Sequence, residues 1–299
     1  MRVANLLKAT ATTLLGATMA GSAVAQENLG ELETIGKPVD KLMGFQTPVT
    51  EVARDIQSYD TFLLWVITII SLFVTGLLIY AAYKFNHKRN KVPATFTHHT
   101  GIEIAWTLIP VLILLALIPS SLGLLFKQME IPEADITIKA TGNQWYWTHE
   151  YVDHEFGFDS FMLDKSALER YGYAADEYLL ATDTAVVVPV NKTVVVQVTG
   201  SDVIHSWTIP AFGVKQDAVP GRIAELWFKA EKEGVYFGQC SELCGKDHSY
   251  MPITVKVVSQ AKYDAWLDGA IKEYAGTPRA VKIADANMIK VLEAENATN

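Results

Sequence analysis

The residues best suited to metal chemistry are concentrated in residues 240–252. This stretch contains both cysteines of the chain and three further potential metal ligands, namely Cys240, Glu242, Cys244, His248 and Met251. Thiolate and thioether sulfurs favour copper, and imidazole suits it as well. A single-copper electron-transfer site needs two histidines, one cysteine and a weakly bound methionine, so one histidine has to come from another part of the chain.

The natural supplier of that histidine is His205, which lies in a strand-like segment. The second cysteine exceeds what one copper requires, and two such thiolates could instead bridge two metal ions. Two alternatives stay open on the residues alone. A Cys240–Cys244 disulfide is ordinary chemistry in an oxidising compartment. Cysteine with histidine also suits structural zinc, although zinc fingers usually have a tighter cysteine spacing and no methionine.

The first residues predict export from the cytoplasm. Arg2 and Lys8 form a positive start, residues 9–20 an apolar middle and residues 23–25 a small-residue cleavage site, so we expect residues 1–25 to be a signal peptide. A retained membrane anchor is the alternative. Removal of two basic residues and no acid would change the formal net charge from −8 to −10. This charge disfavours nucleic acid as a partner and is compatible with a basic protein.

Two long apolar runs predict a membrane anchor. Uncharged runs of 23 residues lie between Asp60 and Lys84 and between Glu103 and Lys127. At about 1.5 Å per residue each helix would be roughly 34 Å long, enough to cross the hydrocarbon core. Buried core helices are the alternative, but they are seldom this long without a charge. We expect residues 26–60 to form an N-terminal segment outside the membrane. Residues 61–83 and 103–126 are then expected to form two transmembrane helices.

The connector between the two runs, residues 84–102, indicates the orientation of the anchor. It carries no acid and four basic residues, Lys84, Lys88, Arg89 and Lys91. The positive-inside rule places such a segment in the cytoplasm, with both flanks on the outer side. Residues 127–276 are therefore expected to form a soluble domain outside the cytoplasm.

This outer domain is predicted to be rich in β-structure. Short β-branched or aromatic segments separated by turn residues predict strands at 186–190, 193–198, 223–228, 234–238 and 253–258. Strands at such spacing are typical of a Greek-key sandwich or barrel. The metal-binding stretch then falls in the loop before the last strand.

Three other parts of the outer region have a weaker pattern. Residues 165–182 are irregular and suggest an insertion, whereas residues 260–274 predict a helix. The charged tail, residues 277–299, is expected either to be poorly ordered or to be removed by processing.

The pattern Cys240-Ser-Glu-Leu-Cys-Gly, followed by His248 and Met251-Pro and preceded by His205-Ser-Trp, resembles subunit II of the haem–copper cytochrome c oxidases, in its bacterial aa3-type form. The segment Gly-Asn-Gln-Trp-Tyr-Trp at residues 142–147 and the two-helix anchor match this family as well. The resemblance extends over about residues 45–270.

The resemblance implies a membrane-anchored all-β fold, in which a two-helix transmembrane hairpin precedes a cupredoxin-like Greek-key barrel or sandwich. The location implied is the bacterial inner membrane, crossed more than once, with the N-terminus and the soluble domain in the periplasm. The partners implied are cytochrome c, subunit I, other oxidase subunits and the lipid bilayer.

The resemblance also implies the binuclear copper centre called CuA, with two copper ions. Its ligands would be the bridging Cys240 and Cys244, His205 and His248 on one copper each, the weak ligand Met251 and the backbone carbonyl of Glu242. The chain would accept electrons from cytochrome c and pass them to haem in subunit I, where O2 is reduced to water as protons are translocated. The haems and the further copper, CuB, would belong to that partner subunit.

Trp145 is the expected point at which electrons reach the chain. In strand-like sequence Trp145 and Trp147 point to one face and Tyr146 to the other, and for Trp147 and Tyr146 a core role is favoured. The resemblance implies that Trp145 faces cytochrome c and that four acids help to dock this basic partner: Glu150, Asp159, Asp183 and Asp202. Such charges raise the association rate and make it sensitive to salt. A generic solvated acidic surface is the alternative.

Two further carboxylates have expected roles. Glu103 opens the second apolar run at its cytoplasmic end, where the helix N-terminus favours an anion, so capping electrostatics alone would explain it. The resemblance implies instead that it lies at the mouth of a proton-uptake channel in the neighbouring subunit. The resemblance also implies that the Glu242 side chain contacts Mg²⁺ or Mn²⁺ at the subunit boundary, and a carboxylate oxygen suits such ions.

Three other functions are weighed against this one. A quinol oxidase subunit II would share the anchor and the β domain but lack the copper ligands. A nitrous oxide reductase would need a large histidine-rich domain, whereas this chain has seven histidines. A copper-delivery or structural module without redox turnover is disfavoured by Trp145 and the acidic residues around it.

Overall fold

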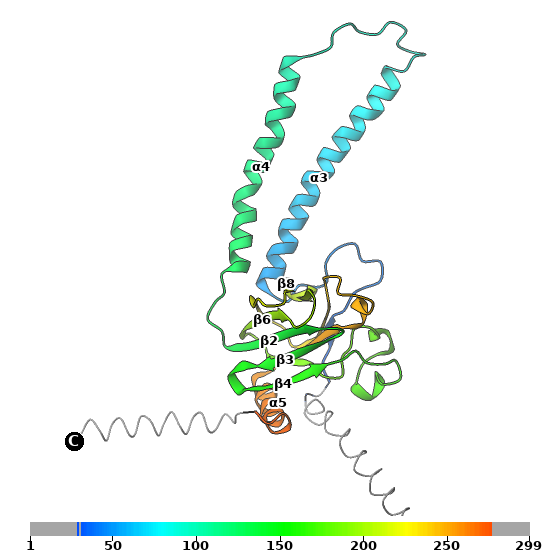
Figure 1. Cartoon of the computed structure of the whole chain (residues 1–299). Helices are drawn as coiled ribbons and strands as arrows, with labels where there is room; N and C mark the ends of the chain where they lie inside the picture. The colour runs from blue at the N-terminus through cyan, green and yellow to red at the C-terminus, as the bar shows by residue number, and fades with distance from the viewer. Residues whose placement is uncertain (1–28, 30, 277–299) are drawn as a thin grey trace, which may run out of the picture. The chain divides into compact units, whose positions relative to one another are not determined.

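The computed structural model describes residue 29 and residues 31–276. Within them the chain forms two compact units, residues 54–130 and a β domain made from the described residues on either side (Figure 1). The predicted signal peptide and the charged C-terminal tail both lie outside the described residues.

Residues 54–130 contain the body of two long helices. Helix α3 spans Glu51–Lys84 and helix α4 spans Thr100–Met129, and both are long and apolar enough to cross a membrane. Their apolar side chains are exposed in this chain, as expected for helices whose surface faces lipid or another subunit. The predicted spans lie inside α3 and α4. Helix α3 nevertheless starts ten residues before its predicted span. The position along α3 at which the bilayer begins therefore stays a prediction.

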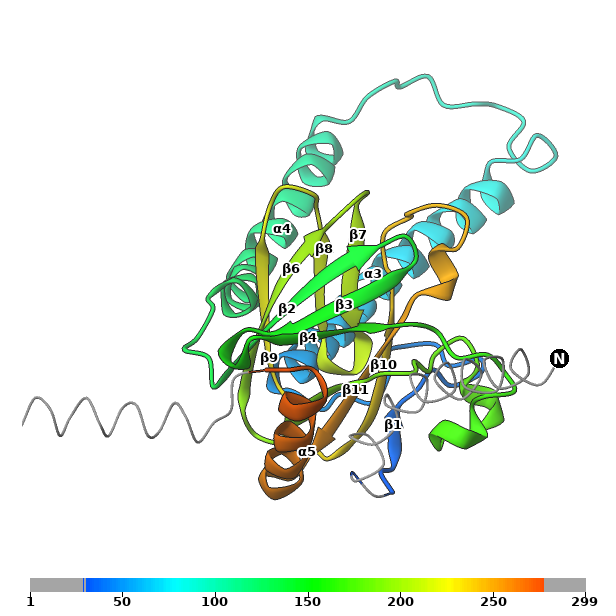
Figure 2. The same ribbon diagram turned by 60° about the horizontal axis from the view of Figure 1, so that its bottom comes forward.

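The β domain consists of two main sheets and a separate hairpin (Figure 2). One sheet has the order β4-β3-β2-β6-β9, which are Phe156–Ser160, Tyr146–Tyr151, Ile136–Asn143, Thr193–Gly200 and Ala224–Lys229. The other has the order β1-β10-β11-β5, which are Thr34–Gly36, Gly234–Gln239, Pro252–Val258 and Val186–Pro189. Strands β7 (His205–Ile209) and β8 (Val214–Ala218) form the hairpin.

Helical segments complete the described chain. Helix α5, Gln260–Glu273, follows β11 and begins at Ser259, whose hydroxyl accepts from the Lys262 backbone N–H. The short 3₁₀ helices are η2 (Val152–His154), η3 (Glu169–Tyr171), η4 (Ala175–Glu177), η5 (Pro210–Phe212) and η6 (His248–Tyr250). The five predicted strands correspond to β5, β6, β9, β10 and β11, and the predicted C-terminal helix is α5.

Buried residues alternate with partly exposed ones in β2 and β3 and with exposed ones in β4, because one face of their sheet packs on the core and the other meets solvent. The core lies between the two main sheets and is rich in aromatic side chains. Tyr151 shows how the sheets are joined. Its hydroxyl donates to the Val187 carbonyl at 2.7 Å and accepts from the Val187 backbone N–H at 2.9 Å.

Strands β10, β11 and β5 are buried on both faces. One face of this sheet packs on the main core, and the irregular segment predicted at residues 165–182 packs against the other face. Leu163, Leu168 and Tyr173 pack with Val235 and Phe237 in a cluster separate from the main core. The predicted insertion therefore covers the outer face of this sheet.

The N-terminal segment is more structured than its polar sequence suggested. Strand β1 pairs in parallel with β10, and Val49 and Ala53 are buried. The Thr50 hydroxyl donates to the Phe212 carbonyl at 2.7 Å and accepts from the Ala53 backbone N–H at 3.0 Å. Residues 31–53 therefore belong to the β domain.

Replacement of Tyr151 by Phe tests how the two sheets are held together. The variant should lower the free energy of unfolding by about 1–3 kcal/mol, because the buried N–H and C=O of Val187 lose their partner. Urea unfolding of the detergent-solubilised chain, followed by tryptophan fluorescence, measures this. The control Tyr146→Phe keeps a ring that stacks on Phe161 and should change stability by less than about 0.5 kcal/mol. Equal effects of the two changes would contradict this account.

Candidate metal centre

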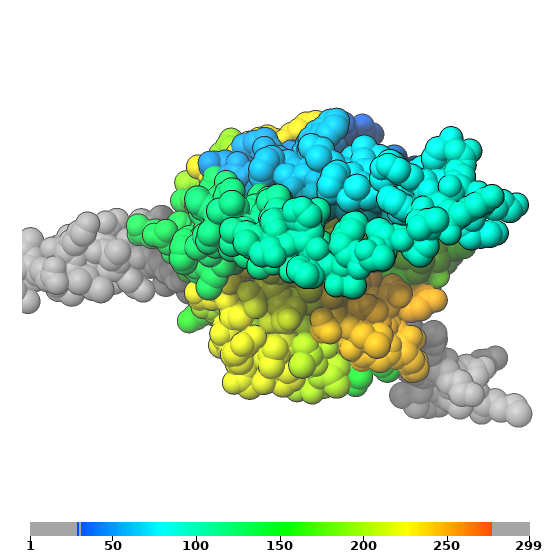
Figure 3. All heavy atoms as spheres, turned by 90° about the horizontal axis from the view of Figure 1, so that it is seen from above, coloured from blue at the N-terminus to red at the C-terminus, as the bar shows by residue number. Residues whose placement is uncertain are grey.

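The centre is assembled where two segments far apart in the sequence meet. Strands β10 and β11 pair up to Gln239↔Pro252, so Cys240 leaves β10 and Met251 enters β11 at the same end of the sheet. His205 is the first residue of β7. The Ser241 backbone N–H donates to the Ser206 carbonyl at 3.0 Å and joins the loop to this strand. In Figure 3 the yellow-green to yellow part of the chain, which includes β7, lies beside the orange part, which includes the loop between β10 and β11.

The predicted donor atoms converge around the two sulfurs. Cys240 Sγ and Cys244 Sγ are 3.8 Å apart. His205 Nδ1 is 3.9 Å from Cys240 Sγ, and His248 Nδ1 is 3.5 Å from Cys244 Sγ. Met251 Sδ is also 3.5 Å from Cys244 Sγ. Of the described residues, His205, Cys240 and Cys244 are the group whose ligand atoms lie close enough together to hold a metal ion.

The sulfur separation distinguishes among the chemistries left open by the sequence. A disulfide needs sulfurs about 2.05 Å apart, and both cysteines are free thiols in this structure. The Cys240 sulfur also lies 3.3 Å from the Glu242 carbonyl oxygen. Two thiols, two imidazoles, a thioether and a carbonyl are more donors than one tetrahedral zinc uses. The donor set therefore fits the predicted pair of coppers better than zinc.

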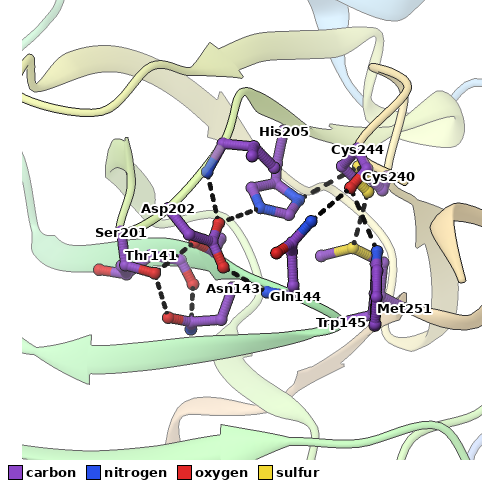
Figure 4. A network of polar contacts seen from close by, with 12 residues as sticks. Thr141, Asn143, Gln144, Trp145, Ser201, Asp202, His205, Cys240, Cys244 and Met251 are labelled. Atoms are coloured by element: carbon purple, nitrogen blue, oxygen red, sulfur yellow. Dashed lines mark hydrogen bonds and ion pairs between the residues drawn. The ribbon is translucent and has the colours of Figure 1, made fainter. Parts of the chain in front are cut away.

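Asp202 orients the histidine of strand β7 (Figure 4). His205 Nε2 donates to the Asp202 carboxylate at 2.8 Å, which leaves Nδ1 directed at the Cys240 sulfur. The same carboxylate accepts from the backbone N–H groups of Gln144 at 2.8 Å and Val203 at 2.6 Å. Burial opposes the charged carboxylate, but these hydrogen bonds prevail and lower the pKa of Asp202. A carboxylate behind a ligating imidazole fixes its tautomer and direction.

The two thiols differ in acidity. Burial raises the pKa of both, but hydrogen bonding to His205 and to the Glu242 and Ser206 backbone prevails at Cys240 and lowers its pKa. At Cys244, burial and the neighbouring Cys240 thiolate act in the same direction and raise the pKa. Burial disfavours protonation of His205, whereas Cys240 and Asp202 favour it more strongly and raise its pKa.

The β2–β3 hairpin forms one wall of the centre. A methyl group on Gly142 would lie 2.8 Å from three atoms of His205, so only glycine lets the imidazole approach this strand. The ring of Trp147 is fully buried and meets the His205 ring edge-on with centroids 6.0 Å apart. Its indole N–H donates to the Met251 carbonyl at 3.3 Å. The sequence pattern did not identify Gly142 as part of the site.

Trp145 does not lie in a strand. It lies against the loop of residues 240–251, called the metal loop below. It is in the turn between β2 and β3, which corrects the strand-like reading of this position. Its indole N–H donates to the Cys244 carbonyl at 3.2 Å, and the Gln144 side-chain amide donates to the same oxygen at 3.0 Å. Trp145 is half-buried. The predicted core role holds for Trp147, whereas Tyr146 is half-buried against Phe161.

The four predicted docking acids have partners within the chain. Glu150 forms an ion pair with Lys139 at 2.6 Å, and Asp159 accepts from the Thr148 hydroxyl at 2.7 Å. Asp183 accepts from the backbone N–H groups of Phe161 and Thr184, and its burial raises its pKa. Asp202, the fourth, supports His205. The sequence contained the clue to this second role, an aspartate three residues before a candidate ligand.

The remaining two carboxylates are positioned differently. Glu103 lies in the first turn of α4 and accepts from the His99 backbone N–H at 3.1 Å, while the His99 ring accepts from the Ile102 N–H at 3.3 Å. This reciprocal arrangement resembles a capping box, so Glu103 does stabilise the helix start. Glu242, within the metal loop, is exposed.

Comparison with known proteins identifies relatives of both units. The profile "Cytochrome C oxidase subunit II, periplasmic domain" matches residues 136–258, and "Cytochrome C oxidase subunit II, transmembrane domain" matches residues 38–124. The chain is 56% identical over 284 residues to "Cytochrome c oxidase subunit 2" of Cereibacter sphaeroides, covering 90% of this chain and 93% of the relative. It is 45% identical over 232 residues to "Probable cytochrome c oxidase subunit 2" of Rickettsia bellii, covering 77% and 85%.

A solved structure is also similar. The crystal structure of the periplasmic domain of subunit II of cytochrome oxidase from Bradyrhizobium japonicum has 52% sequence identity and a TM-score of 0.44, and the match covers 48% of this chain and 99% of that one.

Replacement of Asp202 by Asn tests whether the carboxylate orients His205. Copper affinity should fall by about 10–100-fold, because the imidazole loses the group that fixes its tautomer. A competition titration with a copper chelator measures this. Asp153→Asn is the matched control, since within residues 31–276 that carboxylate accepts from a backbone N–H, of Thr137 at 3.0 Å, and not from a candidate ligand. Unchanged affinity in the Asp202 variant would contradict the assignment.

Proposed function

Because the chain belongs to the cytochrome c oxidase subunit II family, we propose that it holds two coppers and transfers electrons from cytochrome c to haem in subunit I. It is a subunit of the haem–copper oxidase complex. It is membrane-anchored, with a cupredoxin-like periplasmic domain. The proposal adds that both apolar helices cross the inner membrane and that the N-terminus lies in the periplasm.

The observation that carries the proposal is the pair of free sulfurs 3.8 Å apart with an imidazole beside each one. Cys240 and Cys244 would bridge the two metal ions, and His205 and His248 would bind one each. Met251 and the Glu242 carbonyl would complete the set as weaker ligands. Bound copper supplies the capacity to take up and release one electron at a time, shared between two metals.

The surrounding residues keep the ligands in place, which is what electron transfer requires. A site that hardly changes shape between two oxidation states has little reorganisation to undergo. Here Cys240 and Met251 are fixed by the pairing of β10 with β11, and His205 is held by Asp202. Both cysteines, His205 and Met251 are buried, so the protein excludes water from most of the ligand set.

Trp145 would accept the electron from cytochrome c. Its half-buried ring reaches the surface, and its indole N–H is bonded directly to the carbonyl of the ligand Cys244. This contact gives a short route of one hydrogen bond and a few covalent bonds from the surface to the sulfur. Docking would use four acids, Glu150, Asp159, Asp183 and Asp202.

Two carboxylates would face the partner subunits. The exposed Glu242 side chain would contact Mg²⁺ or Mn²⁺ at the boundary with subunit I, since its carbonyl alone is needed for copper. Glu103 would lie at the mouth of a proton-uptake channel in that subunit. Its bond to the His99 N–H is compatible with this role, because one carboxylate oxygen remains for water.

Electron paramagnetic resonance of the copper-loaded protein tests the shared centre. The unpaired electron of the oxidised form is expected to couple equally to two copper nuclei. The variant Cys244→Ser, which keeps one thiolate, should convert this to a signal from one copper. A wild-type signal localised on a single copper would refute the proposal.

Replacement of Trp145 by Gln tests the route for electrons. Copper reduction by cytochrome c in the complete oxidase should slow by at least about tenfold, equivalent to about 1.4 kcal/mol in activation free energy, with copper content unchanged. Stopped-flow absorption measures the rate. Trp227→Gln, at another half-buried tryptophan, should leave it unchanged. A normal rate in the Trp145 variant would exclude this residue as the acceptor.

A further inference from the structure

The metal loop carries a lysine that lies on the proposed electron-accepting tryptophan. Lys246 is located between the ligands Cys244 and His248, and its Nζ is 4.8 Å from the centre of the Trp145 ring. An ammonium group at this distance from an indole ring is attracted to its negative face. The side chain is 75% exposed, so a docking protein that reached Trp145 would also meet this cation.

The loop backbone brings Lys246 to this position. Gly245 has φ +127, in the region that favours glycine, and a methyl group there would lie 3.0 Å from the Trp145 ring. The loop therefore passes directly over the indole before it reaches Lys246. The neighbouring Asp247 forms an ion pair with Lys246 at 2.5 Å and is less exposed than the lysine, at 37% against 75%. The outermost charge of this pair is the positive one.

The four acids proposed for docking are each engaged by a partner within the chain. Glu150 is paired with Lys139, Asp183 is largely committed to backbone N–H groups, and Asp202 supports His205. Asp159 is exposed and accepts from the Thr148 hydroxyl. A donor with lysines over Trp145 would thus meet the exposed Lys246 cation there.

We propose that Lys246 determines which cytochrome c can donate electrons at Trp145. It favours a donor that presents a carboxylate or a neutral group where its exposed haem edge faces Trp145, and it disfavours a donor with lysines at that point. Like charges brought together at an interface are costly and suppress the wrong partners. The inference rests on the proposed role of Trp145 and specifies the partner for the same site.

Charge changes at Lys246 in the complete oxidase test the proposal. Two donors are compared at low ionic strength by stopped-flow reduction of copper: a cytochrome c with a lysine-rich haem edge, and a variant of it in which those lysines are replaced by glutamate. Lys246→Gln should speed the first reaction by about fivefold and slow the second by a similar factor, as expected for unit charges a few ångströms apart in water. High salt should remove both effects.

Control variants separate this effect from others. Lys246→Arg keeps the charge and should behave as wild type with both donors. Lys215→Gln removes another exposed lysine with a nearby aspartate, Asp217 at 3.7 Å, and should change neither rate appreciably. The copper absorption spectrum of each variant verifies that the metal centre is intact.

Three results would overturn the proposal: unchanged rates in Lys246→Gln, changes of the same sign with both donors, or changes matched by Lys215→Gln. The proposed function fails separately. If Trp145→Gln has a normal rate, the electron route is wrong whatever Lys246 does. If Trp145→Gln is slow while Lys246→Gln has no effect, only the selectivity proposal is lost.

Discussion

The centre depends on the distance between two sulfur atoms, and that distance is set by strand pairing. Cys240 follows β10, and Met251 precedes β11, so the last ladder pair between these strands closes the loop that holds every predicted ligand except His205. The hydrogen bond from Ser241 N–H to the Ser206 carbonyl then aligns the loop with β7. Because both anchors are backbone contacts, the loop can keep the thiols 3.8 Å apart without a disulfide.

The close approach of the His205 ring to strand β2 is the second constraint. The imidazole of His205 fits only because Gly142 has no side chain, and the buried Trp147 closes the space beside it. The Gln144 side-chain amide joins the same hairpin to the metal loop at Cys244, and the Gln144 backbone N–H joins it to Asp202, which holds His205. The β2–β3 hairpin thus links the half-buried Trp145 to the buried ligands through direct contacts.

Much of this could be predicted from the sequence, because ligand type and strand pattern are local properties. The cysteine, histidine and methionine spacing identified the loop, and the β-branched segments located five strands. Features that depend on tertiary contact were missed. The sequence pattern predicts a docking role for Asp202, which stays a prediction, but it does not predict the hydrogen bond between its carboxylate and His205. Trp145 was expected in a strand, although it lies in a turn. The polar composition of residues 31–53 does not predict that Thr34–Gly36 pair with β10.

The central claim is that both cysteine sulfurs are shared between two coppers. X-ray absorption at the copper edge of the purified oxidase subunit tests this most directly, because it reports the neighbours of each copper atom. The account predicts two sulfur neighbours and one copper neighbour around each absorbing copper. A copper with a single sulfur and no second copper nearby would contradict it.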